Sequence, residues 1–204
     1  LLFSKIETNP TIIKLQPSTK AKQIGLIKLW LGYFFGVFAG LMAIGHAVPM
    51  IKTMGGSAQI ASTNIILMSL GSAAAGVVAG HIADKMGCRK PLAALTIASA
   101  ISLILLVMSD IQTALILMIC IATLYGAFIA IYPTLVVNLF GKEYSAWVYG
   151  RVFTAWGFAG LCAPTLAGWL YDRSNSYDTS LLITAALAAL SAIAIWQLPQ
   201  EKGL

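Results

Sequence analysis

Six long apolar stretches fill most of this 204-residue chain, and they limit what it can fold into. An α-helix needs about 20 mostly apolar residues to cross a bilayer, and each stretch is close to that length or longer. Hydrophobic residues make up 59% of the chain and charged residues only 10%, against about 25% charged in a soluble domain. So few charges cannot cover a water-soluble surface. The runs are also too long, and alternate too little, for a membrane β-barrel. The sequence therefore predicts an all-α polytopic membrane protein.

Short connections separate the predicted spans, so neighbouring helices are expected to run antiparallel. We expect the six spanning helices at 26–51, 58–80, 91–109, 112–140, 146–171 and 179–198. Residues 1–25 are polar and lack the pattern of a signal peptide, so they are expected to form a cytoplasmic linker, with 199–204 as a cytoplasmic tail. Because residue 1 is not a methionine, we also expect further chain upstream of Leu1.

Lysine and arginine are distributed unevenly between the two predicted sides of the membrane. With residues 1–25 in the cytoplasm, eleven of these bases lie on the cytoplasmic side, and only Lys52 and Arg173 lie outside. Cytoplasmic loops of membrane proteins carry such an excess. The pattern predicts a multi-pass protein of a plasma or inner membrane with both termini in the cytoplasm. It also accounts for the net charge of +6 without nucleic-acid binding.

A short internal repeat links the two halves of the chain. Gly80-His81-Ile82-Ala83-Asp84-Lys85 returns 88 residues later as Gly168-Trp169-Leu170-Tyr171-Asp172-Arg173. Each copy ends a predicted helix, and the two copies face opposite sides of the membrane. Residues 26–109 and 112–198 are therefore expected to form two inverted three-helix repeats, an arrangement found in secondary transporters.

The string from Gly80 to Lys90 resembles the signature of the major facilitator superfamily. The resemblance implies the C-terminal six-helix half of a transporter and a conformational-switch loop in this string. In that loop Gly80 would allow close helix contact, Asp84 would pair at a helix end, and Gly87 would make the turn. The three bases, which would pair with acids or helix C-termini as the cytoplasmic face closes, are Lys85, Arg89 and Lys90. The alternative is an ordinary basic cytoplasmic loop.

A second string resembles the oxalate/formate antiporter family and its monocarboxylate-transporter relatives. It comprises Tyr125-Gly126, Tyr132-Pro133, Asn138–Gly141, Tyr149-Gly150, Gly157, Gly160, Pro164, Gly168, Tyr171-Asp172 and Tyr177. The resemblance implies exchange or proton-coupled transport of a small organic anion, with an N-terminal six-helix half supplied by the same polypeptide. Some oxalate-type members have a lysine where this chain has Trp156. A buried dianion needs cationic partners, so a monocarboxylate fits this chain better than oxalate.

Five side chains are candidates to contact the substrate. Arg151 would attract an anion or snorkel to water, Asn64 would bind ligand or join helices, and Trp156 would line a cavity or pack against lipid. Tyr125 and Tyr132 lie two turns apart on one helix face, so their hydroxyls could bind a carboxylate. His46, near the outer end of its helix, is a candidate for proton coupling, or is simply hydrated.

Several small and helix-breaking residues indicate how the helices pack. The candidates for close helix contact are Gly32, Gly36, Gly40 and Gly76. Pro133 and Pro164 are expected to kink their helices, for gating or for shape.

The motifs of common enzymes are absent from the sequence, and no cofactor or metal site is expected. Transport has two alternatives. One is a non-transporting membrane protein: a truncated half-transporter, a solute sensor or an assembly subunit. The other is a half-size transporter that pairs with itself.

Overall fold

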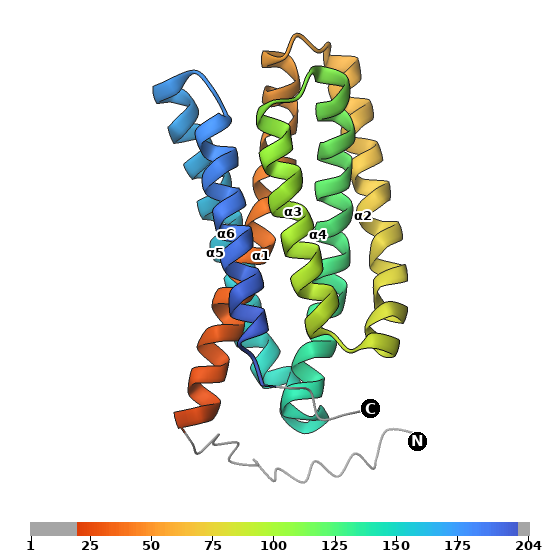
Figure 1. The fold of residues 1–204 in the computed structure, drawn as a ribbon, viewed down its shortest axis with the longest axis vertical. Coiled ribbons are helices and arrows are strands. Elements are labelled where there is room, and N and C mark those ends of the chain that lie inside the picture. The colour runs from red at the N-terminus through yellow and green to blue at the C-terminus, as the bar shows by residue number, and fades with distance from the viewer. Residues whose placement is uncertain (1–19, 200–204) are drawn as a thin grey trace, which may run out of the picture.

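The computed structural model describes residues 20–199, and their side chains from residue 25 onward. The described residues form an antiparallel bundle of six helices with no strand (Figure 1). The helices are α1 (Lys20–Thr53), α2 (Ala58–Met86), α3 (Arg89–Val107), α4 (Ile111–Phe140), α5 (Lys142–Ser174) and α6 (Asp178–Trp196). The predicted all-α architecture is confirmed.

Local signals account for several helix ends. The Ser57 side chain accepts the backbone N–H of Ile60 at 3.2 Å and caps α2. Asp110 caps α4 in the same way, through the N–H of Thr113 at 3.3 Å. The hydrogen bonds from Thr113 hold the pKa of the Asp110 carboxyl below its usual range. Gly87 ends α2 with a φ of 74°, a backbone conformation that favours glycine.

The two three-helix units are related as inverted repeats. α2 and α5 end 88 residues apart, at Met86 and Ser174, and α3 and α6 are each 19 residues long. The corresponding helices of the two units also make corresponding contacts. In the first unit α2 and α3 pack on α4, and in the second unit α5 and α6 pack on α1. Corresponding helices run in opposite directions (Figure 1). The two units therefore have the same packing, with the helix directions reversed.

The helix after the first connection is longer than the sequence suggested. We expected it to end at Gly80 and a loop to follow, but α2 continues to Met86 and only Gly87 and Cys88 separate it from α3. Gly80 and Asp84 therefore lie within a helix, which corrects the predicted loop. A backbone in lipid keeps its internal hydrogen bonds wherever it can, and a lone glycine does not end a helix there. The first helix likewise starts earlier, at Lys20, while the remaining linker and tail residues lie outside the described part.

Five of the six helices are long and apolar enough to cross a membrane. The exception is α5, which has the length, 33 residues, but carries polar and aromatic side chains along much of it. Its buried stripe consists of small residues: Val148, Val152, Ala155, Ala159, Ala163 and Ala167. This stripe lets α5 lie close to α1. The polar residues of α5 lie on its other sides.

Glycines bring α1 and α2 into close contact with α4. A Cβ atom at Gly36 would lie 2.2 Å from the Phe128 ring, and one at Gly40 would lie 2.3 Å from Tyr125 Cγ. Gly126 is more restricted, since a Cβ atom there would lie 2.2 Å from the backbone carbonyl oxygen of Ser72. Gly32 and Gly76 have looser surroundings, with nearest atoms at 3.2 Å and 3.8 Å. Pro133 and Pro164 both lie inside helices that continue past them.

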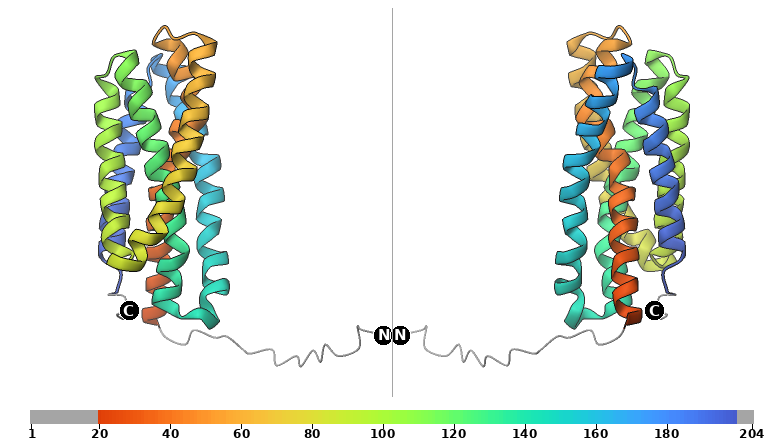
Figure 2. Two further views of the ribbon diagram at one scale, coloured as in Figure 1. Left: turned by 90° about the vertical axis from the view of Figure 1, so that its right-hand side faces the viewer. Right: turned by 90° about the vertical axis from the view of Figure 1, so that its left-hand side faces the viewer.

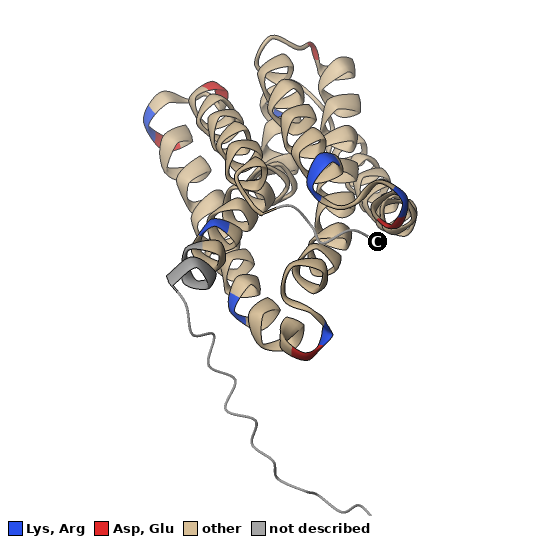
Figure 3. Ribbon diagram, turned by 60° about the horizontal axis from the view of Figure 1, so that its bottom comes forward, with Lys and Arg blue, Asp and Glu red and all other residues tan. Residues whose placement is uncertain are grey.

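The charged side chains gather at the two ends of the bundle (Figure 3). One end holds the start of α1, the α2–α3 and α4–α5 connections and the end of α6, and we call it the basic end. Its bases with described side chains are Lys28, Lys85, Arg89, Lys90, Lys142 and Arg151. The opposite end carries two described bases, Lys52 and Arg173. Both ends of the described chain thus lie at the basic end.

Candidate functional site

A cluster of aromatic side chains joins α1, α4 and α5 on one side of the bundle. The aromatic cluster consists of Tyr33, Tyr125, Tyr149, Phe153 and Trp156. Successive members are close: the Phe153 ring centroid lies 5.6 Å from Tyr149, 5.5 Å from Trp156 and 6.3 Å from Tyr33. Phe153 and Trp156 are 41% and 37% exposed, so the cluster has an open face.

Tyr125 and Trp156 form a hydrogen-bonded pair in which the Tyr125 hydroxyl can still donate its own proton. The indole Nε1–H of Trp156 donates to the Tyr125 hydroxyl at 2.8 Å. The hydroxyl oxygen therefore acts as acceptor, and its own proton has no acceptor among the described residues. A hydroxyl in this state is oriented by the indole and can donate to a ligand.

Tyr33 adds a buried hydroxyl to the same cluster. Its side chain is 0% exposed, and its hydroxyl has no hydrogen-bond partner in good geometry within the described part of the chain. The Tyr149 hydroxyl is close enough to interact with it. Buried hydroxyls are usually satisfied, and Tyr149 is the nearest group that can satisfy this one. Tyr33 therefore forms the buried base of the cluster, below its open face.

Tyr132 and Asn64 do not join this cluster. Tyr132 is fully buried, and its hydroxyl donates to the Leu29 carbonyl at 2.6 Å, so it has no free proton for a ligand. Asn64 is 3% exposed and lies on α2, where its amide approaches the sulfur atoms of Met68 and Met118 at 3.6 and 3.8 Å. It lines a separate groove between α2 and α4, and among the described residues α2 does not contact α5.

Arg151 lies on a different side of α5 from the cluster. Its guanidinium carbon sits 3.5 Å from the Trp147 ring centroid, and its Nη1 donates to the Trp147 carbonyl at 3.4 Å. At 3.6 residues per turn, Arg151 is rotated by about 160° from Phe153. Its neighbour on that side is Thr154, which accepts from Trp30 Nε1 at 2.9 Å. The structure thus separates the one predicted cationic contact from the predicted aromatic contacts.

Sequence reasoning did not select Tyr33, Tyr149 or Phe153 as site residues. A signal for two of them was present: Tyr149, Phe153 and Trp156 follow the i, i+4, i+7 spacing of one helix face. Tyr33 is recognised only from the packing of α1 against α4 and α5, since nothing in its local sequence separates it from the neighbouring Phe34 and Phe35.

His46 ties three elements together toward the opposite end. Its Nε2 lies 2.9 Å from the Pro164 carbonyl oxygen and its Nδ1 lies 3.1 Å from the Tyr177 hydroxyl. A carbonyl only accepts, so the proton is assigned to Nε2, and Nδ1 of the neutral ring accepts from Tyr177. Burial raises the pKa of Tyr177, with Tyr171 and Asp172 acting in the same direction, so the phenol remains a donor. The ring thereby joins α1, α5 and the connection before α6.

We expect His46→Phe to lower the stability of the full-length protein by about 1 kcal/mol. Phenylalanine keeps the ring but loses both interhelical hydrogen bonds, and such bonds in membrane proteins average about 0.6 kcal/mol each. Thermal unfolding of the purified protein measures the change. His81→Phe is the matched control, because His81 approaches only a carbonyl of its own helix, that of Val77. Equal melting temperatures for the two variants would contradict a tethering role for His46.

The signature string contacts two other helices: the Cys88 sulfur accepts from the Asn138 amide of α4 at 3.5 Å, and Arg89 reaches the end of α6. The Arg89 Nη2 donates to the carbonyl oxygen of Trp196, the last residue of α6, and its guanidinium carbon lies 5.4 Å from the Trp196 ring centroid. A cation is favourable at a helix C-terminus. Asp84 is exposed in the last turn of α2 and makes no hydrogen bond to another described residue. Lys85 and Lys90 are also exposed.

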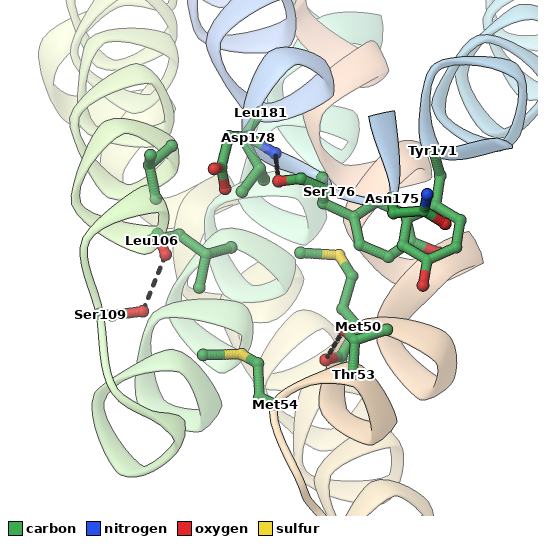
Figure 4. Close-up of a pocket in the computed structure, with 12 residues that line it drawn as sticks. Met50, Thr53, Met54, Leu106, Ser109, Tyr171, Asn175, Ser176, Asp178 and Leu181 are labelled. Atoms are coloured by element: carbon green, nitrogen blue, oxygen red, sulfur yellow. Dashed lines mark hydrogen bonds between the residues drawn. The ribbon is translucent and has the colours of Figure 1, made fainter. Parts of the chain in front are cut away.

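A cavity of about 280 Å³ lies near the opposite end, between α1, α3 and the α5–α6 connection (Figure 4). Two of its hydroxyls are already in use: Thr53 donates to the Met50 carbonyl at 2.8 Å and Ser109 to the Leu106 carbonyl at 2.9 Å. None of the aromatic-cluster residues lines it. We therefore do not assign the substrate site to this cavity.

Comparison with known proteins places the chain among transporters. It is 26% identical over 177 residues to the oxalate:formate antiporter of Oxalobacter formigenes. The aligned region covers 84% of this chain and 42% of that protein. A shorter match, 34% identical, is with monocarboxylate transporter 14 of Homo sapiens and covers 30% of this chain and 12% of the relative. Another, also 34% identical, is with the "Probable sulfoacetate transporter SauU" of Cupriavidus necator and covers 32% of this chain and 15% of the relative. The chain therefore spans less than half the length of each of these relatives.

The match to a family as a whole is more extensive than any of these. The sequence profile of the Major Facilitator Superfamily matches residues 29–203, which includes all of α2 to α6 and most of α1. Together with the six-helix bundle and its inverted repeats, this match shows that the chain belongs to the Major Facilitator Superfamily.

Proposed function

We propose that this chain is the C-terminal half of a secondary transporter that moves a small, singly charged organic anion by alternating access. The observation that carries the proposal is the open face of the aromatic cluster, where Trp156 orients the Tyr125 hydroxyl and leaves its proton available. Neutral O–H donors on an open face can bind a carboxylate. The names of the relatives support the same class, since each one names a small organic anion or a monocarboxylate.

The charge of the cluster argues for a monoanion. It contains no lysine, arginine, aspartate or glutamate, and Arg151 faces another side of α5. A dianion in a water-poor site would lack the cations it needs, whereas a monocarboxylate needs fewer. Any cation beside the substrate would come from the partner half, and a coupled proton or counter-anion would balance the charge. His46 remains a candidate for proton coupling.

The partner half is proposed to be six further helices of the same polypeptide. The relatives are more than twice the length covered by this chain, which supports a missing half. We also propose that the basic end faces the cytoplasm of a plasma or inner membrane, because its described bases outnumber those of the opposite end.

The direct test is uptake by the full-length protein in proteoliposomes. We expect counterflow or pH-driven uptake of labelled lactate, formate or acetate, and much weaker uptake of oxalate. The empty liposome and a protein with Tyr33→Phe and Tyr125→Phe together are the controls. Absence of uptake with substrate-induced thermal stabilisation would instead favour a sensor, and absence of both across a broad carboxylate panel would favour an assembly subunit.

We expect Asp84→Asn to slow turnover and leave substrate binding nearly unchanged. Asp84 is at the basic end, away from the aromatic cluster, and its carboxylate has no described partner, so it is available to pair with the other half as that end closes. Initial uptake rates would fall while the dissociation constant from substrate-induced quenching stays the same. Loss of binding in a correctly folded Asp84→Asn protein would contradict the switch role.

A further inference from the structure

A groove of about 430 Å³ opens between α2 and α3, at a distance from the aromatic cluster. Its walls are apolar and include small residues from both helices, and its floor is formed by α4. The lining residues are Ala79, Ile82, Met86, Lys90, Pro91, Ala94, Leu95, Ala98, Leu124, Ala127 and Ile131. Lys90 is the one charged residue among them.

The groove exists because α2 and α3 are joined by a short connection and then diverge. Only Gly87 and Cys88 connect α2 to α3, yet α3 packs mainly on α6 and α4 while α2 packs on α4. The gap that results is lined by alanines, which do not fill it. Two larger apolar side chains on its rim, Ile82 and Met86, are 41% and 63% exposed.

The groove and the aromatic cluster lie on different sides of the bundle. Among the described residues α5 contacts neither α2 nor α3. The side view in Figure 2 (left) shows α3 and α5 on opposite sides of the bundle, with α2 and α4 between them. A partner half that covers the aromatic cluster therefore leaves the α2–α3 side to the lipid.

The dimensions and the charge of the groove match one leaflet of a membrane. From Lys90 to Ala98 it rises by about 12 Å at 1.5 Å per residue, close to half of a hydrocarbon core of about 30 Å. Lys90 is at the basic end of the bundle, where its ammonium can reach the headgroup region while its stem lies along the apolar wall. The polar end of the groove is thus positive, and the rest is apolar.

We propose that this groove binds an anionic phospholipid, with one acyl chain between α2 and α3 and the headgroup phosphate on Lys90. Basic pockets between membrane helices on the cytoplasmic side suit such headgroups. The site depends on the chain spanning a membrane and not on the proposed substrate. Failure of lipid binding would therefore leave the transport proposal intact, and the converse also holds.

The test is native mass spectrometry of the delipidated full-length protein with added phosphatidylglycerol or phosphatidylcholine. We expect one tightly retained phosphatidylglycerol per chain in preference to phosphatidylcholine. Lys90→Gln is expected to weaken phosphatidylglycerol binding about fivefold, since one lysine near a lipid surface contributes a factor of that order. Ala94→Phe is expected to weaken binding of both lipids by filling the groove. Ala94 and Lys90 are both exposed, so neither change disturbs the core.

Two controls decide between this site and general attraction to the basic end. Lys142→Gln makes the same change of charge at the basic end but outside the groove, and it is expected to leave retention unchanged. Glycerol 1-phosphate, a headgroup without acyl chains, is expected not to bind. The proposal is overturned if Lys90→Gln and Lys142→Gln behave alike, if Ala94→Phe retains lipid like the wild type, or if glycerol 1-phosphate competes with the lipid.

Discussion

Gly126→Ala is expected to abolish recovery of well-folded protein, because the added methyl group has no room. Its Cβ atom would lie 2.2 Å from the carbonyl oxygen and 2.7 Å from the carbonyl carbon of Ser72. These are backbone atoms of α2, so they move only if the helix moves. Overpacking of a core costs about 1–3 kcal/mol, and displacement of a whole helix is expected to exceed the upper value.

The yield of monodisperse full-length protein and its melting temperature measure this effect. Gly150→Ala is the control, since a Cβ atom there meets nothing within 4 Å. Gly36→Ala should be intermediate, because its nearest neighbour is the tip of the Phe128 ring, a side chain that can turn. A Gly126→Ala protein as stable as Gly150→Ala would mean that α2 and α4 are farther apart in the membrane than in this structure.

Tyr125→Phe is expected to lower the transport efficiency about tenfold. It removes the hydroxyl that Trp156 orients toward a ligand, and a lost hydrogen bond from a buried donor costs about 1–3 kcal/mol. Uptake of labelled monocarboxylate at several concentrations gives the efficiency. The loss should appear mainly as a higher half-saturation concentration.

Tyr132→Phe makes the same chemical change two turns along the same helix. Its hydroxyl is committed to the Leu29 carbonyl, so this variant should lose thermal stability and keep its half-saturation concentration. Arg151→Gln should likewise leave the half-saturation concentration within about twofold, because Arg151 stacks on Trp147 away from the cluster. A large rise with Arg151→Gln and none with Tyr125→Phe would move the substrate site to the other side of α5.

The architecture could be predicted because the hydropathy of a membrane helix is a strong signal. The six apolar runs, the short connections and the repeat at Gly80 and Gly168 sufficed for the helix order and the inverted units. The end of α2 was missed for a physical reason: hydropathy marks where the apolar run stops, but Lys and Arg are good helix formers, and the backbone keeps its internal hydrogen bonds past that point. The low hydropathy of α5 was also not anticipated.

The site was predictable only in part, because a sequence shows which residues share a helix face but not what that face contacts. The pairing of Tyr125 with Trp156 joins two predicted residues, and its hydrogen bond became visible only once α4 lay beside α5. Arg151 stood out as a lone cation, yet the contact that decides its position is with Trp147, one turn earlier on α5. Tyr33 is identified by its packing against Phe153 of α5, which no sequence pattern displays.

The single residue between α4 and α5 has a mechanical consequence. Gly141 alone joins them, with a φ of 80°, so the two helices form a tight hairpin at the basic end. Tyr125 lies on α4 and Trp156 lies on α5, so a rigid-body rotation of the hairpin would move both side chains together. Under the proposed alternating access, the hydrogen-bonded pair would move as a unit, and a bound anion would keep the same hydroxyl contact in both open states.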